Sequence, residues 1–212
     1  MPNNMAGNSH FCEQDLSAEF LAHYQQQTVL GVDTETMGLI PVRDRLCLVQ
    51  ISDAAGQTTL VKILPGQTQA PHLQTLLETP DILKIFHYAR FDLATLRYHL
   101  NIQVQPIFCT KIASKIARTY SPKHGLKEVV QELVGVELDK QSQSSDWGRP
   151  DALRPEQLAY AANDVIYLPQ VAEQLTAMLQ REGRWQLTQQ CFQCVPTIVS
   201  LDLLNYQGIF EH

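Results

Sequence analysis

The order of the apolar segments constrains the fold more than any other feature of this sequence. Three short segments with strand-like composition follow one another at 28–36, 45–53 and 57–63, and turn-forming residues separate the last two. This succession predicts an antiparallel meander. Two further strand-like segments, at 82–87 and 104–109, alternate with segments of helical spacing. Such alternation is typical of crossover connections between parallel strands.

The remaining segments have apolar residues at the spacing of an amphipathic helix. They lie at 15–27, 71–78, 90–100, 110–119, 125–134 and 155–181. Pro169 should kink or break the last of them, because proline cannot donate a backbone hydrogen bond. Together the segments predict an α/β domain with a mixed five-stranded sheet, three antiparallel strands and then parallel crossovers, flanked by helices.

Composition narrows the class of protein further. The chain has 212 residues, of which 44% are hydrophobic and 18% charged, so one domain over 1–212 is expected and disorder is excluded. No apolar run is long enough to span a membrane, and the N-terminus has neither the basic nor the apolar region of a signal peptide. We therefore expect a cytoplasmic location and no membrane partner. The net charge of −6 argues mildly against non-specific nucleic-acid binding.

Four acidic residues occupy unusual places in this pattern. Asp33 and Glu35 end the first predicted strand, where residues i and i+2 point to the same face. Asp92 follows the fourth strand at the start of a helix, and Asp164 lies in an apolar helical stretch. Tyr160, four residues before Asp164, shares its helical face. Taken singly, Asp33 and Glu35 are more often surface acids, Asp92 a helix N-terminal acid and Tyr160 a core tyrosine than functional groups. An acid inside an apolar helical stretch, as at Asp164, is unusual without a partner.

Taken together and in order, the stretches resemble a known family. VDTET, HYARFD and YAANDV are similar to the three exonuclease motifs of the DEDD superfamily, in its tyrosine-bearing subgroup that includes ribonuclease D. RDRLCLVQIS, HGLKEVVQELVGVELDK and QSSDWGRP resemble further parts of ribonuclease D. The resemblance covers a motif-bearing core at about 28–182. The helical extension at about 183–212 resembles small stand-alone bacterial forms. The implied fold is ribonuclease H-like, in agreement with the strand order.

The resemblance implies a two-metal-ion 3′–5′ exonuclease that releases nucleoside 5′-monophosphates from single-stranded 3′ ends, with a role in RNA processing. Asp33, Glu35, Asp92 and Asp164 would be catalytic and would bind two divalent ions, Mg²⁺ or Mn²⁺, and Tyr160 would orient the attacking water. This chemistry suits the residues, because hard cations prefer carboxylate oxygens and two ions can activate water and neutralise the leaving oxygen.

Two alternatives stay open at this stage: a DNA exonuclease of the same fold, and a catalytically inert nucleic-acid-binding module. The presence of all four acids and the tyrosine argues against the inert module. The partner is expected to be single-stranded RNA or DNA with a free 3′ end, and no obligate protein partner is indicated.

One helix face offers a candidate contact for that partner. Lys111, Lys115 and Arg118 share a face at spacings i, i+4 and i+7. They form either a solvated helix surface or a strip that contacts phosphates. Two positions, Tyr88 and Cys109, depart from residues common in the family, where Asn and Asp are frequent. Neither is one of the four ligand positions.

Overall fold

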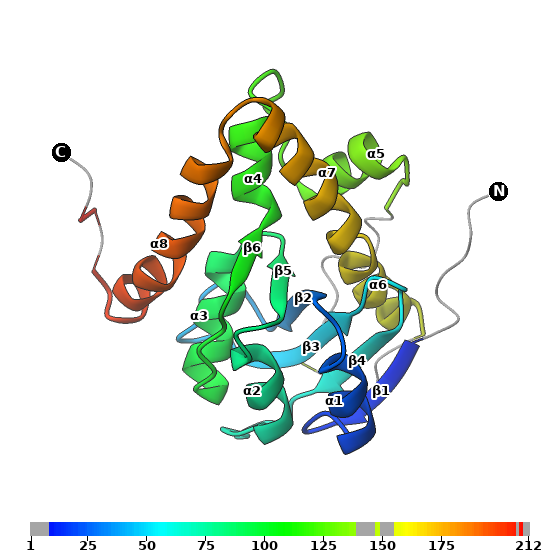
Figure 1. Ribbon diagram of the computed structural model, residues 1–212. Helices are drawn as coiled ribbons and strands as arrows, with labels where there is room; N and C mark the ends of the chain where they lie inside the picture. The colour runs from blue at the N-terminus through cyan, green and yellow to red at the C-terminus, as the bar shows by residue number, and fades with distance from the viewer. Residues whose placement is uncertain (1–8, 139–146, 149–154, 207, 210–212) are drawn as a thin grey trace.

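The computed structural model describes residues 9–138, 147–148, 155–206 and 208–209. Its sheet has the strand order β1-β4-β3-β2-β5-β6 (Figure 1). The strands are β1 (Ser9–Glu13), β2 (Val29–Thr36), β3 (Leu46–Ser52), β4 (Thr58–Lys62), β5 (Leu83–Phe86) and β6 (Ile107–Cys109). β2, β3 and β4 form the predicted antiparallel meander, and β5 and β6 continue the sheet in parallel from β2. The mixed α/β fold is therefore confirmed.

The prediction of five strands is wrong, because β1 adds a sixth. This strand pairs in parallel with β4, from Ser9 opposite Thr58 to Glu13 opposite Lys62. Four of its five residues are exposed, so the segment lacks the apolar alternation by which a half-buried strand is recognised. Its place at the edge of the sheet depends on backbone pairing with β4.

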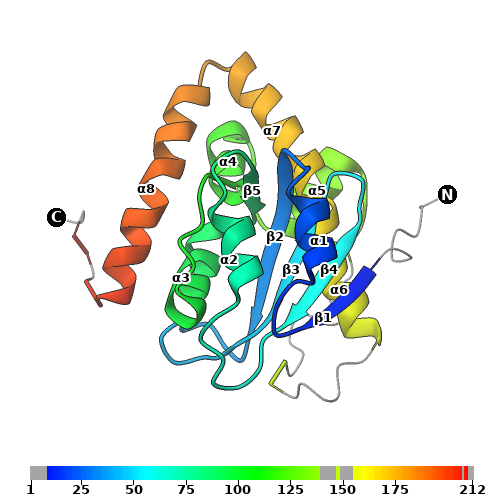
Figure 2. The same cartoon turned by 60° about the horizontal axis from the view of Figure 1, so that its bottom comes forward.

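The helices cover both faces of the sheet (Figure 2). They are α1 (Ala18–Tyr24), α2 (Pro71–Glu78), α3 (Ala89–Leu100), α4 (Thr110–Ala117), α5 (Leu126–Val134), α6 (Pro155–Ile166), α7 (Leu168–Arg181) and α8 (Trp185–Leu203). α6 packs on β2, β3 and β4, α7 packs on β2 and β5, and α8 packs against α3. The predicted break near Pro169 is confirmed, since α6 ends at Ile166 and α7 starts at Leu168 with Pro169 in its first turn. None of the described helices has both the length and the apolar character required to cross a bilayer.

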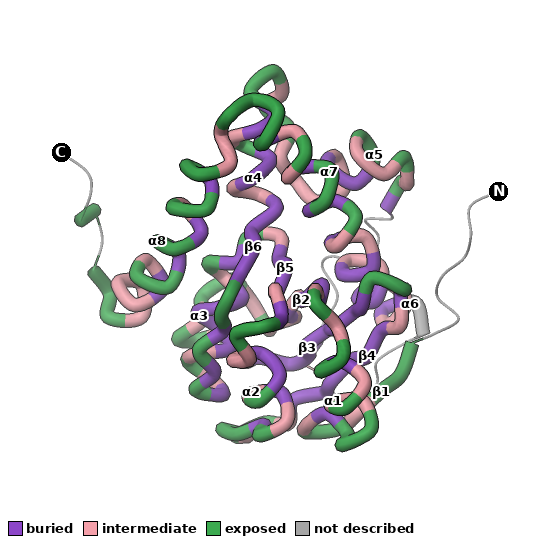
Figure 3. The backbone as a smooth tube through the Cα atoms, viewed as in Figure 1, coloured by how far each residue is buried: buried purple, intermediate pink, exposed green. Residues whose placement is uncertain are grey.

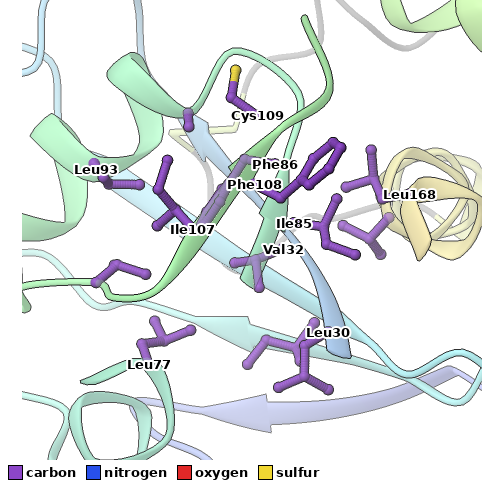
Figure 4. Packing of buried hydrophobic residues seen from close by; sticks show 14 of the residues in the cluster. Leu30, Val32, Leu77, Ile85, Phe86, Leu93, Ile107, Phe108, Cys109 and Leu168 are labelled. Atoms are coloured by element: carbon purple, nitrogen blue, oxygen red, sulfur yellow. The ribbon is translucent and has the colours of Figure 1, made fainter. Parts of the chain in front are cut away.

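The main core lies between the central strands and the helices, and the tube drawing shows these strands as buried (Figure 3). Leu30 and Val32 of β2, Phe86 of β5 and Leu168 of α7 belong to one buried cluster (Figure 4). A smaller buried cluster, made of Cys47, Leu48, Leu60, Trp147 and Ala161, joins β3 and β4 to α6. These contacts hold α6 against the meander, next to the end of β2.

Candidate active site

The end of β2 carries the first two acids of the site. Residues alternate between the two faces of a strand, so Gly31, Asp33 and Glu35 face α6 and Thr34 faces α3. Asp33 and Glu35 are half-buried, whereas Thr34 is buried. The alternation predicted from the sequence is confirmed, and it places two carboxylates side by side at the base of a cavity.

Helix α6 brings Asp164 to the same place. At Gly31, a Cβ atom would lie only 2.4 Å from the backbone oxygen of Val165, so glycine is required for α6 to approach β2 this closely. As a result, Asp33, Glu35 and Asp164 offer carboxylate oxygens that all lie within 4.8 Å of one another. Tyr160, one turn earlier on α6, forms a side-chain hydrogen bond with Asp164.

Asp92 reaches the cluster from the other face of the sheet. Thr34 Oγ1 donates a hydrogen bond of 2.7 Å to Asp92 Oδ1, and the Asp92 side chain also hydrogen-bonds to Asp33. Only 2% of Asp92 is exposed. The structure thus gathers three of the four predicted acids around one point and places the fourth behind Asp33.

Burial and mutual repulsion act on all four carboxyl groups. Burial, followed by repulsion from Asp92, raises the pKa of Asp33 well above its ordinary range. Burial together with Asp33 and Asp164 raises the pKa of Glu35 to about 10. Burial raises the pKa of Asp92 to about 7, and burial and Asp33 raise that of Asp164. Carboxyl groups that repel one another in this way are stabilised as anions by a cation between them.

The acids open into a cavity of about 600 Å³ between β2, α4, α5 and α6. Its lining includes Met37, Leu39, His87, Lys111, Trp147 and Tyr160. Burial, followed by the neighbouring Lys111, lowers the pKa of His87 to about 4, so this imidazole is neutral at neutral pH. Trp147 comes from the stretch QSSDWGRP, whose Ser145 and Asp146 lie outside the described residues.

The predicted basic strip on α4 is not a single surface. Lys111 lines the cavity, with its Nζ 4.3 Å from the centroid of the Tyr88 ring, and Lys115 is exposed. The expectation that Arg118 joins them is wrong, because Arg118 is fully buried and forms an ion pair with Glu132. Its guanidinium also donates to Ser114 Oγ and to the Lys123 carbonyl. Helical spacing placed the three residues in one angular range but did not show that α5 covers the last of them.

Sequence reasoning missed two residues that shape the site. Thr34 lies between the two acids of D-x-E, and strand alternation alone would have directed it toward Asp92. Gly31 is the position where α6 contacts β2. Its only signal was a glycine inside an apolar strand, which often marks a close backbone approach.

Comparison with known proteins identifies the family. A model of 3′–5′ exonuclease domains matches residues 10–180, a range that contains all four acids and Tyr160. The chain belongs to the 3′–5′ exonuclease family.

Individual relatives agree with this membership. Ribonuclease D from Sphingobium indicum is 32% identical over 167 residues, which is 79% of this chain but 42% of that protein. The chain thus spans about two-fifths of the length of this curated relative. This chain is also similar to NrnC from Brucella melitensis, whose structure was solved with bound Mg²⁺. The two are 44% identical with a TM-score of 0.91, and the match covers 97% of this chain and 99% of the NrnC chain. Another structure of the same protein is bound to pGG, at 45% identity and a TM-score of 0.91, over 97% of this chain and 98% of that one. Ribonuclease D from Escherichia coli, at 22% identity and a TM-score of 0.76 over 88% of this chain and 50% of that one, shares the fold.

Proposed function

We propose that the protein is a two-metal-ion 3′–5′ exoribonuclease that removes nucleoside 5′-monophosphates from single-stranded 3′ ends. The observation that carries this proposal is the convergence of Asp33, Glu35 and Asp164 within 4.8 Å, with Asp92 hydrogen-bonded behind Asp33. Family membership and the resemblance to ribonuclease D support the same reaction.

The donor set suits Mg²⁺ or Mn²⁺. The three clustered ligands are all carboxylates, which hard cations prefer over the imidazole and thiolate groups that favour softer metals. Asp33, Glu35 and Asp164 would hold one ion, and Asp33 with Asp92 would hold the second. Bound at such a site, the two ions activate water and neutralise the leaving oxygen. The structure of Brucella melitensis NrnC with bound Mg²⁺ supports this choice of metal.

Tyr160 is suited to orient the attacking water rather than to deprotonate it. Burial and the neighbouring Asp164 carboxylate raise the pKa of its hydroxyl far above the ordinary value, so the hydroxyl stays protonated at neutral pH. A protonated hydroxyl that donates to Asp164 keeps its oxygen lone pairs available to accept a hydrogen bond from water. Tyr160 is therefore suited to accept a hydrogen bond from the attacking water and to orient it.

The walls of the cavity suit one end of a nucleic-acid strand. Lys111 brings a positive charge to the same cavity, while Met37, Leu39 and Trp147 offer apolar contacts for bases. A volume of about 600 Å³ lies within the usual range for small-ligand pockets, about 300–1,000 Å³. The ribonuclease D relatives favour an RNA end over DNA, and the pGG bound by NrnC supports a nucleic-acid substrate.

Matched RNA and DNA oligonucleotides labelled at the 5′ end test this proposal. With Mg²⁺, the RNA should shorten stepwise from its 3′ end faster than the DNA, and EDTA should stop the reaction. Faster shortening of the DNA would show that DNA, and not RNA, is the preferred substrate. Binding of both without shortening would indicate an inert nucleic-acid-binding protein.

A further inference from the structure

Gln50, in the middle of β3, is a buried amide without a protein partner. Its side chain is fully buried, and neither its Oε1 nor its Nε2 atom has a hydrogen-bond partner among the described residues. Most buried polar groups in proteins are hydrogen-bonded, because burial of an unsatisfied amide destabilises the fold. A residue that carries this cost in the core calls for a functional reason.

The sheet register places Gln50 beside the acidic cluster. Gln50 lies directly opposite Asp33 in the antiparallel pair of β2 and β3. Residues opposite each other in such a pair point to the same face, with their Cβ atoms about 4.5–5.5 Å apart. Gln50 and Asp33 therefore both lie under α6.

The other neighbours of Gln50 on this face do not use its amide. Leu60, its partner on β4, and Leu48, two residues earlier, are apolar. The hydroxyl of Ser52, two residues later, donates to the Asp53 carbonyl and accepts from Thr58 Oγ1. Asp33 is the flanking residue that offers an acceptor, because a carboxylate has about four lone-pair sites and a bound ion uses only some of them.

We propose that Gln50 is a positioning residue for the metal site: when a divalent ion is bound, its amide nitrogen donates to the Asp33 carboxylate and holds it in the orientation that binds the ion. This inference rests on the proposed function, because it takes Asp33 as a metal ligand. An amide suits the task, since it fixes a carboxylate without bringing a cation that would compete with the metal. Partners of this kind typically change metal affinity by about 10–100-fold when they are replaced.

Gln50→Met tests the proposal, because methionine keeps the length of the unbranched side chain and removes both hydrogen-bonding atoms. Titration calorimetry with Mn²⁺ alone, without nucleic acid, should show binding about 10–100-fold weaker than in the wild type. The melting temperature of the EDTA-treated variant should equal or exceed that of the wild type, since an unsatisfied amide has left the core. In activity assays, a higher Mn²⁺ concentration should restore kcat.

Two control variants distinguish failure of the metal site from failure of the role of Gln50. Leu60→Met alters the packing on the other side of Gln50 and should leave Mn²⁺ affinity unchanged. Asp33→Asn should abolish Mn²⁺ binding.

The outcomes differ for the two claims. Unchanged Mn²⁺ affinity in Asp33→Asn would overturn the metal site itself. Loss of Mn²⁺ binding in Asp33→Asn together with normal Mn²⁺ affinity in Gln50→Met would overturn only the role of Gln50. A lower melting temperature in both Gln50→Met and Gln50→Leu, or failure of both to fold, would show that Gln50 is structural and would also overturn it.

Discussion

The hydroxyl of Tyr160 is the smallest group on which the proposed mechanism depends. Tyr160→Phe removes that hydroxyl and keeps the ring, so packing on α6 should change little. We expect kcat to fall by about 10²-fold, at the lower end of the range for positioned groups. KM and Mg²⁺ affinity should stay close to wild type, because the lost hydrogen bond acts mainly as water approaches phosphorus. Steady-state kinetics and thermal melting on the same preparation measure both effects. A lower melting temperature with normal kcat would make Tyr160 an ordinary core residue.

Asp33 should lower the stability of the fold when no metal ion is bound. The folded-state pKa values of the site acids are raised, to about 7 for Asp92 and about 10 for Glu35. The folded protein therefore binds more protons than the unfolded chain between pH 4 and these values, and its stability falls as pH rises through that window. Asp33→Asn removes a carboxyl group whose ionisation the folded state disfavours. In EDTA, it should stabilise the fold at pH 7.5 by about 1–2 kcal/mol, and this gain should shrink at pH 4.5.

Thermal melting of wild type and Asp33→Asn in EDTA at the two pH values measures the difference. A variant less stable than wild type at pH 7.5 would contradict the account of repulsion among the four acids.

At the residue scale, local periodicity predicted which side chains share a face, and the resemblance to ribonuclease D implied that they form one site. The spacing of Asp33 and Glu35 and that of Tyr160 and Asp164 each follow from one element. The burial and the partners of Arg118 and Gln50 depend on which other element packs against them, and no local sequence pattern shows this. Arg118 forms an ion pair with Glu132 of α5, and the register of β2 and β3 places Gln50 beside Asp33.

At the scale of elements, the contact between α6 and β2 sets the distance between Asp164 and Asp33. Gly31→Ala would place a Cβ atom 2.4 Å from the Val165 carbonyl oxygen, so the end of α6 must move. We expect a loss of about 1–3 kcal/mol in stability, as for other overpacked cores, together with weaker Mg²⁺ binding. Urea unfolding and calorimetry check the two effects. An Ala variant with normal stability and metal affinity would show that α6 does not depend on this contact.

The two ends of α4 should respond differently to loss of charge. Lys111→Gln should weaken binding of a single-stranded oligonucleotide and reduce the slope of log affinity against log salt by roughly 0.7, the effect of one phosphate contact. Arg118→Gln should instead destabilise the fold by about 1–3 kcal/mol, because it removes a fully buried guanidinium together with its hydrogen bonds to Ser114 and Lys123 and its ion pair with Glu132. Oligonucleotide binding at several salt concentrations measures the first effect, and urea unfolding measures the second. A changed salt slope in Arg118→Gln with unchanged stability would contradict the buried position of Arg118.

The elements themselves were predictable where burial leaves a pattern: a continuous apolar run in the central strands and one apolar face in the helices. β2, β3, β5 and the amphipathic α4 and α5 lie within a few residues of their expected ranges. β1 could not be predicted in this way, because its residues are mostly exposed and its pairing partner, β4, lies almost fifty residues further along the chain. Backbone pairing of this kind leaves no pattern in the side chains.

At the scale of the whole molecule, the fold unites groups from distant parts of the chain in one cavity. β2 supplies Asp33 and Glu35, α3 supplies Asp92, and α6 supplies Tyr160 and Asp164. The resemblance to the exonuclease motifs implied this meeting, and the parallel pairing of β2 and β5 agrees with it, since the ends of adjacent parallel strands lie at one edge of the sheet. We propose that the site at this edge hydrolyses RNA from a free 3′ end.

Linear and circular forms of one RNA sequence test that claim most directly. With Mg²⁺, the wild type should convert the linear RNA to nucleoside 5′-monophosphates, identified by mass spectrometry, and leave the circle intact. Asp164→Asn, which removes one of the three clustered carboxylates, should release no product from either form. Cutting of the circle, or release of mononucleotides by folded Asp164→Asn at the wild-type rate, would contradict the account.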